Sequence, residues 1–195
     1  KKHLYFSKWK KNIKNSYFYN NFFTKLEDRV NFDEEKKLEK ISIVMPSYNK
    51  VDFIEQSILS VLNQNYPNIE LIIIDGGSTD GTVEIIKKYD QYITFWISEK
   101  DQGQSDALNK GFKHCTGSIY GFLNSDDVYL PGAFKYSSLI LEKNLDKKVV
   151  FGDWLSLDKK NFIIDYNHAF DFNLNHFKYE GFHLSATSMF WRSEV

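Results

Sequence analysis

The chain has 195 residues, of which 42% are hydrophobic and 17% aromatic, and its formal net charge is −1. This composition is too apolar for a disordered chain, and the length is enough to bury one sizeable core. The single cysteine, Cys115, excludes an intrachain disulfide and a zinc site made of several thiolates, and it fits a reducing compartment.

The charges are spread unevenly along the chain. Residues 1–40 hold 11 Lys and Arg against 6 Asp and Glu, whereas residues 41–195 hold 14 against 20. We therefore expect a basic, aromatic-rich extension over residues 1–40 and an acidic domain over residues 41–195. Because the chain breaks off at Val195 inside an expected segment, we expect this domain to be truncated at its C-terminal end.

The extension has two open interpretations. Its first 26 residues contain no acidic group and interleave seven lysines with aromatic residues. Such a segment forms either a helical hairpin packed on the main domain or an amphipathic stretch in peripheral contact with an anionic membrane. No nucleic-acid partner is expected, because the net charge is near zero and no nucleic-acid-binding module is recognisable.

From Ile41 onward, short β-rich apolar runs alternate with stretches of helical spacing, which is typical of an open α/β sheet. The apolar runs are too short to span a membrane, so we expect a soluble domain. Strands are expected over residues 41–45, 69–74, 92–98, 118–123, 148–151 and 162–165, and helices over 53–64, 104–114 and 131–143 and around 83–86. Pro131 is expected at the first position of its helix.

Polar residues follow three of these strands, at residues 47–49, 75–80 and 124–127. The carboxyl ends of strands are where open α/β sheets bind ligands, so we expect one site at this edge. Taken alone, each loop could equally be a turn that caps the next helix.

The last of these loops carries two adjacent carboxylates, Asp126 and Asp127. Their mutual repulsion calls for a cation, and hard divalent cations bind one or two carboxylates together with phosphate oxygens. The arginines of the chain are Arg29 and Arg192, so an anion bound by the domain has little arginine to neutralise it. A diphosphate neutralised by a metal ion is the hypothesis that fits both facts.

Four motifs occur in one order along the domain, and with the segment 99–111 they carry a resemblance. The motifs are Met45-Pro46-Ser47-Tyr48-Asn49-Lys50, Ser60-Val61-Leu62-Asn63-Gln64, Ile74-Asp75-Gly76-Gly77-Ser78-Thr79-Asp80-Gly81-Thr82 and Leu123-Asn124-Ser125-Asp126-Asp127. From residue 41 to about 195 the chain resembles family 2 glycosyltransferases. The resemblance implies the GT-A fold, a Rossmann-like open mixed sheet flanked by helices, here with a helical N-terminal extension.

The resemblance also implies roles for the residues of the nucleoside side. Pro46 and Tyr48 would line the nucleobase pocket, and Asp75 would bond the base or the ribose. The expected ligand is a nucleoside diphosphate sugar, with UDP as the expected nucleotide.

On the diphosphate side, the resemblance places Gly103, Asp106 and Asn109 over the sugar diphosphate. Asp126 would face the ribose, and Asp127 would hold Mg²⁺ or Mn²⁺ on the diphosphate. The implied reaction is a metal-dependent transfer of the sugar, with inversion, to a hydroxyl of a glycan or lipid-linked acceptor. The implied setting is polysaccharide or glycolipid biosynthesis in the cytoplasm, including the membrane surface.

Inverting transfer needs a carboxylate base, which in relatives lies beyond a segment resembling residues 190–195. We therefore expect the base beyond Val195, with Asp153 as a stand-in candidate; Asp153 and His183 are expected nearest the acceptor.

Two alternatives stay open. One is a sugar nucleotidyltransferase, although Pro46-Ser47-Tyr48-Asn49 lacks the glycine-rich basic signature that this class would show after its first strand. The other is a nucleotide-sugar-binding module without transfer activity.

Overall fold

The computed structural model describes residues 38–158, 162–169, 175, 178 and 184–195. The described residues fall into two compact units: a larger one, which contains residues 38–152 and 184–195, and a smaller one within residues 153–168. The helical hairpin or membrane contact predicted for residues 1–40 lies outside the described residues, apart from the last three positions.

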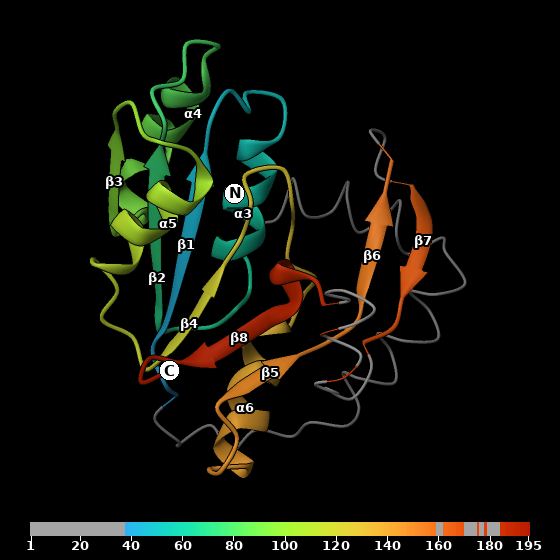
Figure 1. The fold of residues 1–195 in the computed structure, drawn as a ribbon. Coiled ribbons are helices and arrows are strands. Elements are labelled where there is room, and N and C mark those ends of the chain that lie inside the picture. The colour runs from blue at the N-terminus through green and yellow to red at the C-terminus, as the bar shows by residue number, and fades with distance from the viewer. Residues whose placement is uncertain (1–37, 159–161, 170–174, 176–177, 179–183) are drawn as a thin grey trace. The chain divides into compact units, whose positions relative to one another are not determined.

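The larger unit is built on a six-stranded sheet in the order β3-β2-β1-β4-β8-β5 (Figure 1). Its strands are β1 (Ile41–Ser47), β2 (Ile69–Asp75), β3 (Phe95–Ser98), β4 (Ile119–Phe122), β5 (Val149–Phe151) and β8 (Met189–Arg192). β1 pairs in parallel with β2 and β4, and β2 with β3, whereas β8 runs antiparallel between β4 and β5. The predicted open mixed sheet is confirmed.

Helices cover both faces of this sheet because β1 and β2 are apolar on both faces. The helices are α3 (Ile54–Leu62), α4 (Thr82–Lys88), α5 (Gln104–Phe112) and α6 (Ala133–Lys143), with short 3₁₀ turns η1 (Asp90–Tyr92) and η2 (Ala186–Ser188). α3, α4 and α6 contribute to one core cluster with Ile41, Ile43 and Met45, and α5 packs Ala107 against Val44 on the other face.

The close approach of α5 to the sheet explains one glycine. A Cβ on Gly111 would lie 2.3 Å from Cγ1 of Val44, so only glycine lets the helix backbone sit this close to β1. The contact fixes α5 on the sheet and thereby places its N-terminus beside the carboxyl ends of β1 and β4.

Some boundaries differ from the prediction. The helix expected to begin at Pro131 begins at Ala133, because Gly132 adopts a left-handed conformation (φ 86°) before it. Tyr92 belongs to a 3₁₀ turn, and β3 starts three residues later. The sequence analysis missed β6 (Trp154–Leu157) and β8.

The smaller unit contains an antiparallel pair formed by β6 and β7 (Ile163–Asn167). Neither unit has a described helix that is both long and apolar enough to cross a membrane.

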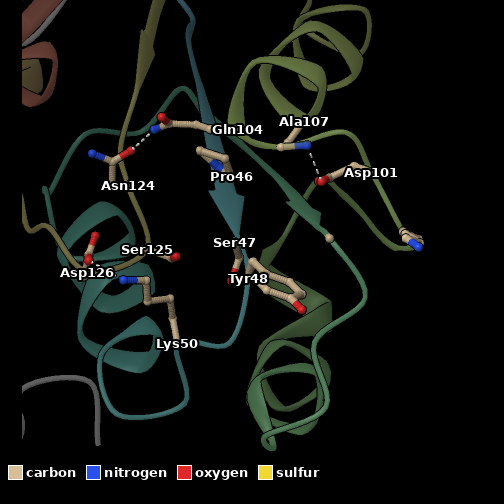
Figure 2. Close-up of a pocket in the computed structure, with 13 residues that line it drawn as sticks. Pro46, Ser47, Tyr48, Lys50, Asp101, Gln104, Ala107, Asn124, Ser125 and Asp126 are labelled. Carbon is tan, nitrogen blue, oxygen red and sulfur yellow. Dashed lines mark hydrogen bonds and ion pairs between the residues drawn. The ribbon is translucent and has the colours of Figure 1, made fainter.

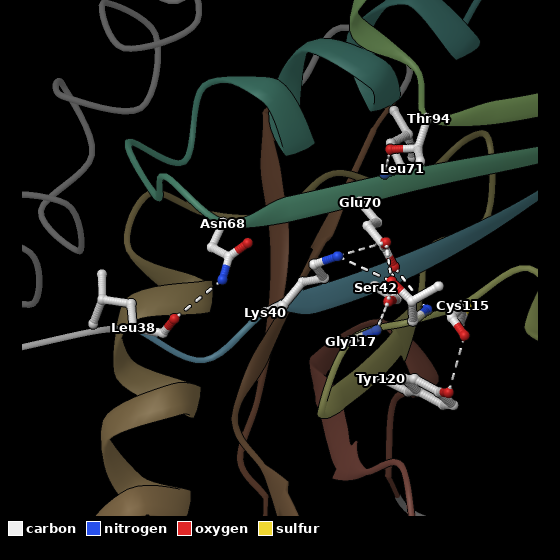
Figure 3. Close-up of polar contacts among 11 residues, drawn as sticks. Leu38, Lys40, Ser42, Asn68, Glu70, Leu71, Thr94, Cys115, Gly117 and Tyr120 are labelled. Carbon is white, nitrogen blue, oxygen red and sulfur yellow. Dashed lines mark hydrogen bonds and ion pairs between the residues drawn. The ribbon is translucent and has the colours of Figure 1, made fainter.

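A polar network ties the amino-terminal ends of β1 and β2 to the turn before β4 (Figure 3). The carboxylate of Glu70, which is 7% exposed, accepts hydrogen bonds from Ser42 Oγ (2.6 Å), Lys40 Nζ (3.0 Å) and the backbone N–H (2.8 Å) and hydroxyl of Thr116. Burial raises the pKa of Glu70, but these hydrogen bonds outweigh it and lower the pKa from 4.5 to about 2.

This network predicts how stability depends on pH. A carboxyl whose pKa is lowered by folding stabilises the protein above its unfolded pKa, and this contribution disappears as the pH falls from about 4.5 to 2. The shift corresponds to about 3 kcal/mol of unfolding free energy. Glu70→Gln should therefore be less stable than the unmodified protein at pH 7, and the two should converge near pH 2. Urea unfolding at each pH measures this, and two parallel curves would contradict it.

Candidate functional site

The carboxyl ends of β1, β2 and β4 and the N-terminus of α5 surround a pocket of about 590 Å³ (Figure 2). The residues that line it are Pro46, Ser47, Tyr48, Lys50, Gly76, Lys100, Asp101, Gly103, Gln104, Ala107, Asn124, Ser125 and Asp126. Four residues predicted for the site therefore line one pocket: Pro46, Tyr48, Gly103 and Asp126.

The loops after β1 and β2 hold each other in place. The backbone N–H of Asn49, which has a left-handed conformation (φ 49°), donates to Ser78 Oγ (2.8 Å), and Asn49 Oδ1 accepts from Thr79 N (3.0 Å). The backbone N–H of Val51 donates to a carboxylate oxygen of Asp80 (3.0 Å). This bracing fixes the loop that carries Tyr48, whose side chain is 61% exposed at the pocket.

Asp75 is the buried anchor of the second loop. Its side chain is fully buried, and its carboxylate accepts hydrogen bonds from Gly77 N (3.1 Å), Ser78 N (2.8 Å), Ser78 Oγ (2.5 Å) and Ser98 Oγ (2.7 Å). Gly76 lines the pocket and Asp75 does not. The carboxylate predicted to bond the nucleoside is thus buried beneath the loop and bonded to Gly77, Ser78 and Ser98, and its contact with a nucleoside stays a prediction.

The two adjacent carboxylates have different surroundings. Asp126 is exposed at the pocket wall, and its Oδ2 lies 2.6 Å from Lys50 Nζ (Figure 2). Asp127 is half-buried outside the wall, where its Oδ2 accepts hydrogen bonds from Asn124 Nδ2 (3.0 Å) and Thr187 Oγ1 (2.8 Å). The repulsion expected from the sequence is relieved by these separate partners.

α5 closes the opposite side of the pocket. Gly103, with φ 106°, precedes the helix in a conformation that favours glycine. Its N–H donates to Asp101 Oδ1 (2.8 Å), and the Gln104 Nε2 group reaches across to Asn124 Oδ1 (2.5 Å). The pocket is thus bridged between the helix and the loop that carries the acidic pair.

Besides Asp75 and Asp127, two further predicted residues, Asp106 and Asn109, lie outside the pocket wall. Asp106 accepts a hydrogen bond from Gln102 N (3.1 Å) and forms an ion pair with Lys110 (3.2 Å), and both interactions lower the pKa of its carboxyl. Asn109 is exposed on α5 and does not line the pocket. Their proposed contacts with the sugar diphosphate stay predictions.

One buried polar atom faces this region without a partner. Ser47 is 5% exposed, and its Oγ has no hydrogen-bond partner among the described residues, although Ser47 lines the pocket. A buried hydroxyl without a partner is uncommon in folded proteins, and a bound polar group would satisfy it.

Asp153 belongs to the smaller unit. Its carboxylate accepts a hydrogen bond from the hydroxyl of Tyr166, and its Oδ2 lies 3.4 Å from His168 Nδ1. Burial and the hydrogen bond to Asp153 raise the pKa of Tyr166 to about 12. The role of Asp153 as a base stays a prediction, and His183 lies outside the described residues.

The sequence analysis did not single out Lys50, Asp101 or Gln104, which the structure adds to the pocket wall. Lys50 is the last residue of the first motif, and Asp101 lies in the segment 99–111, two residues before Gly103. Their positions beside predicted residues in the sequence were the available signal. The direction of each side chain and the distance that it spans depend on the folded backbone.

The sequence profile of glycosyl transferase family 2 matches residues 42–192, which include every strand of the six-stranded sheet apart from the first residue of β1. The chain belongs to glycosyltransferase family 2. The resemblance seen in the sequence is confirmed, and family membership favours a glycosyltransferase over a sugar nucleotidyltransferase.

This family 2 chain is similar to named relatives. A putative teichuronic acid biosynthesis glycosyltransferase, TuaG of Bacillus subtilis, is 38% identical over 109 residues, which are 54% of this chain and 40% of TuaG. Among solved structures, S. aureus TarS 1–349 in complex with UDP has a TM-score of 0.59 at 19% identity, over 79% of this chain and 47% of that one.

A third similar protein is the mannosyltransferase PcManGT of Pyrobaculum calidifontis, solved with GDP-Man and Mn²⁺. It has a TM-score of 0.52 at 20% identity, over 72% of this chain and 42% of that one. These structural similarities confirm the GT-A fold. The family 2 chain spans less than half the length of each of these three proteins.

Proposed function

We propose that residues 41–195 form the donor-binding domain of a glycosyltransferase that uses a nucleoside diphosphate sugar. The observation that carries the proposal is the pocket at the carboxyl edge of the sheet, where an exposed tyrosine, a lysine and an acidic residue face one cavity in a family 2 chain. The flat ring of Tyr48 can stack on a nucleobase, and the polar side chains of the pocket wall can bind a diphosphate. TarS, with the same fold, binds UDP, which supports UDP as the nucleotide.

A divalent cation fits the acidic side of this pocket. Asp126 offers carboxylate oxygens to the cavity, and a positive group of the chain itself, Lys50 Nζ, already lies 2.6 Å from one of them. The described residues contain no cluster of three or more His, Cys, Asp or Glu side chains around one point. Mg²⁺ and Mn²⁺ accept this arrangement, because they use one or two carboxylates and take further oxygens from phosphate and water.

We assign the cation to Asp126 and Asp127 together, with Asn124 and Thr187 fixing the orientation of Asp127. When bound, Mg²⁺ or Mn²⁺ would stabilise the negative charge of the departing nucleoside diphosphate. PcManGT, which shares the fold, was solved with Mn²⁺.

The remaining parts of the proposal concern the acceptor. We propose inverting transfer to a hydroxyl of a glycan or lipid-linked acceptor in cytoplasmic polysaccharide or glycolipid synthesis. The name of TuaG, which refers to teichuronic acid biosynthesis, supports a polysaccharide pathway, and the single cysteine fits a reducing compartment. A binding module without transfer activity is the second candidate, because no residue of the pocket wall is assigned as the base.

Tyr48 gives a direct test of the nucleoside side. Replacing Tyr48 with alanine removes the exposed ring at the pocket, and we expect the affinities for uridine and for UDP to fall by the same factor, about tenfold. Tyr48→Phe keeps the ring and should stay within about threefold of the unmodified protein. Isothermal titration measures both. Unchanged uridine affinity in the alanine variant would place the base elsewhere.

A further inference from the structure

The inference concerns Lys50 and rests on the proposed donor site. We propose that Lys50 is a built-in counter-ion that competes with the divalent cation for Asp126 and, once that cation binds, contacts the diphosphate of the donor. Lys50 would thus be a binding residue with two alternating anionic partners.

The backbone of Lys50 is held firmly, so its side chain is the part that can move. Its N–H donates to Thr82 Oγ1 (2.8 Å), and its carbonyl oxygen accepts from Phe53 N (3.0 Å) and Ile54 N (2.9 Å). These bonds fix Lys50 between the first loop and the start of α3. The ammonium can therefore exchange partners within the pocket without any change in the loop.

The ion pair itself is suited to exchange. Lys50 Nζ lies 2.6 Å from Asp126 Oδ2, yet the two side chains are 36% and 40% exposed. Water-exposed pairs of this kind contribute little to stability, because solvent screens the attraction. A divalent cation at the same carboxylate would displace the ammonium with little loss of stability. The positive charge of the cation would also repel the ammonium.

The diphosphate is the anion that can receive the displaced ammonium. The cationic side chains of the pocket wall are Lys50 and Lys100. Arg192 is occupied elsewhere, since its guanidinium donates to the carbonyl oxygen of Leu141 (2.8 Å). Lys50 is the lysine paired with Asp126, so it lies on the side where the cation and the diphosphate would meet. Lys100 precedes Asp101 in the sequence, and Asp101 lies across the pocket from Asp126 (Figure 2).

Removing the charge of Lys50 should change the affinities for Mn²⁺ and for UDP in opposite directions. In the absence of nucleotide, Lys50→Ala and Lys50→Gln should bind Mn²⁺ about two- to fivefold more tightly than the unmodified protein, because the competing charge is gone. With Mn²⁺ saturating, the same variants should bind UDP about five- to tenfold more weakly and uridine within twofold. Lys50→Arg should restore most of the UDP affinity. The electron paramagnetic resonance signal of free Mn²⁺ measures the first effect, and calorimetry measures the second.

Lys100→Ala is the matched control for the Mn²⁺ measurement, because it removes a lysine from the same wall without touching the Asp126 pair; its Mn²⁺ affinity should change less than twofold. Equal or weaker Mn²⁺ binding by both Lys50 variants, or an equal loss of UDP and uridine, would overturn the proposal. Failure of the unmodified protein to bind any nucleotide would instead refute the proposed function, and the Mn²⁺ measurement would still decide whether Lys50 and the cation compete.

Discussion

Replacing Asp75 with alanine is expected to lower the free energy of unfolding by about 3 to 5 kcal/mol. The carboxylate is fully buried and accepts four hydrogen bonds, so the substitution leaves the N–H groups of Gly77 and Ser78 and two hydroxyls without their partner. Chemical denaturation measures the loss. Ser98→Ala removes one of the four donors and should cost about 1 kcal/mol, which provides a scale for the larger effect.

The same experiment separates the two roles considered for Asp75. The resemblance implies a bond to the base or the ribose, and the structure places the side chain beneath the loop. An Asp75→Ala protein that keeps its stability within about 1 kcal/mol but no longer binds uridine would contradict the structural account and support direct contact with the nucleoside.

Replacing Asp126 with asparagine is expected to abolish the part of UDP affinity that depends on Mn²⁺, a loss of about 100-fold or more, without lowering thermal stability. Asp126 is exposed at the pocket wall, so its charge supports a ligand more than the fold. Asp127→Ala should also lose metal-dependent binding, but with some loss of stability, because Thr187 and Asn124 lose their acceptor. Calorimetry with Mn²⁺ and then with excess chelator, alongside thermal melts, measures both.

The comparison between these two variants decides which carboxylate holds the cation. If Asp126→Asn keeps its Mn²⁺-dependent affinity and Asp127→Ala loses it at unchanged stability, then Asp127 alone holds the cation, as the resemblance implies. Unchanged affinity in both variants would remove the metal site from the account.

The fold was predictable because its signals are local. Ile41, Ile43 and Val44 belong to a short apolar run that is typical of a buried strand. Residues 75–81, at the carboxyl end of β2, are rich in residues that favour turns. β8 was missed because Met189 to Arg192 is short and has no periodicity of its own; it is a strand because it fits between β4 and β5.

The location of the site in the fold was predictable from the sequence, but its side-chain contacts were less so. Which loops meet follows from the parallel topology, so Tyr48 and Asp126 were found. The burial of Asp75, the turning of Asp127 toward Thr187 and the reach of Lys50 to Asp126 depend on side-chain packing between residues 23 to 76 positions apart. No sequence pattern encodes these contacts.

We expect the pocket to bind a nucleoside diphosphate together with a divalent cation. Calorimetric titration of this chain with UDP, GDP and dTDP, each with Mn²⁺ and then with excess chelator, tests it most directly. We expect saturable binding of one of the three, UDP, that weakens at least tenfold when Mn²⁺ is removed. Absence of binding for all three nucleotides in the presence of Mn²⁺ would contradict the account.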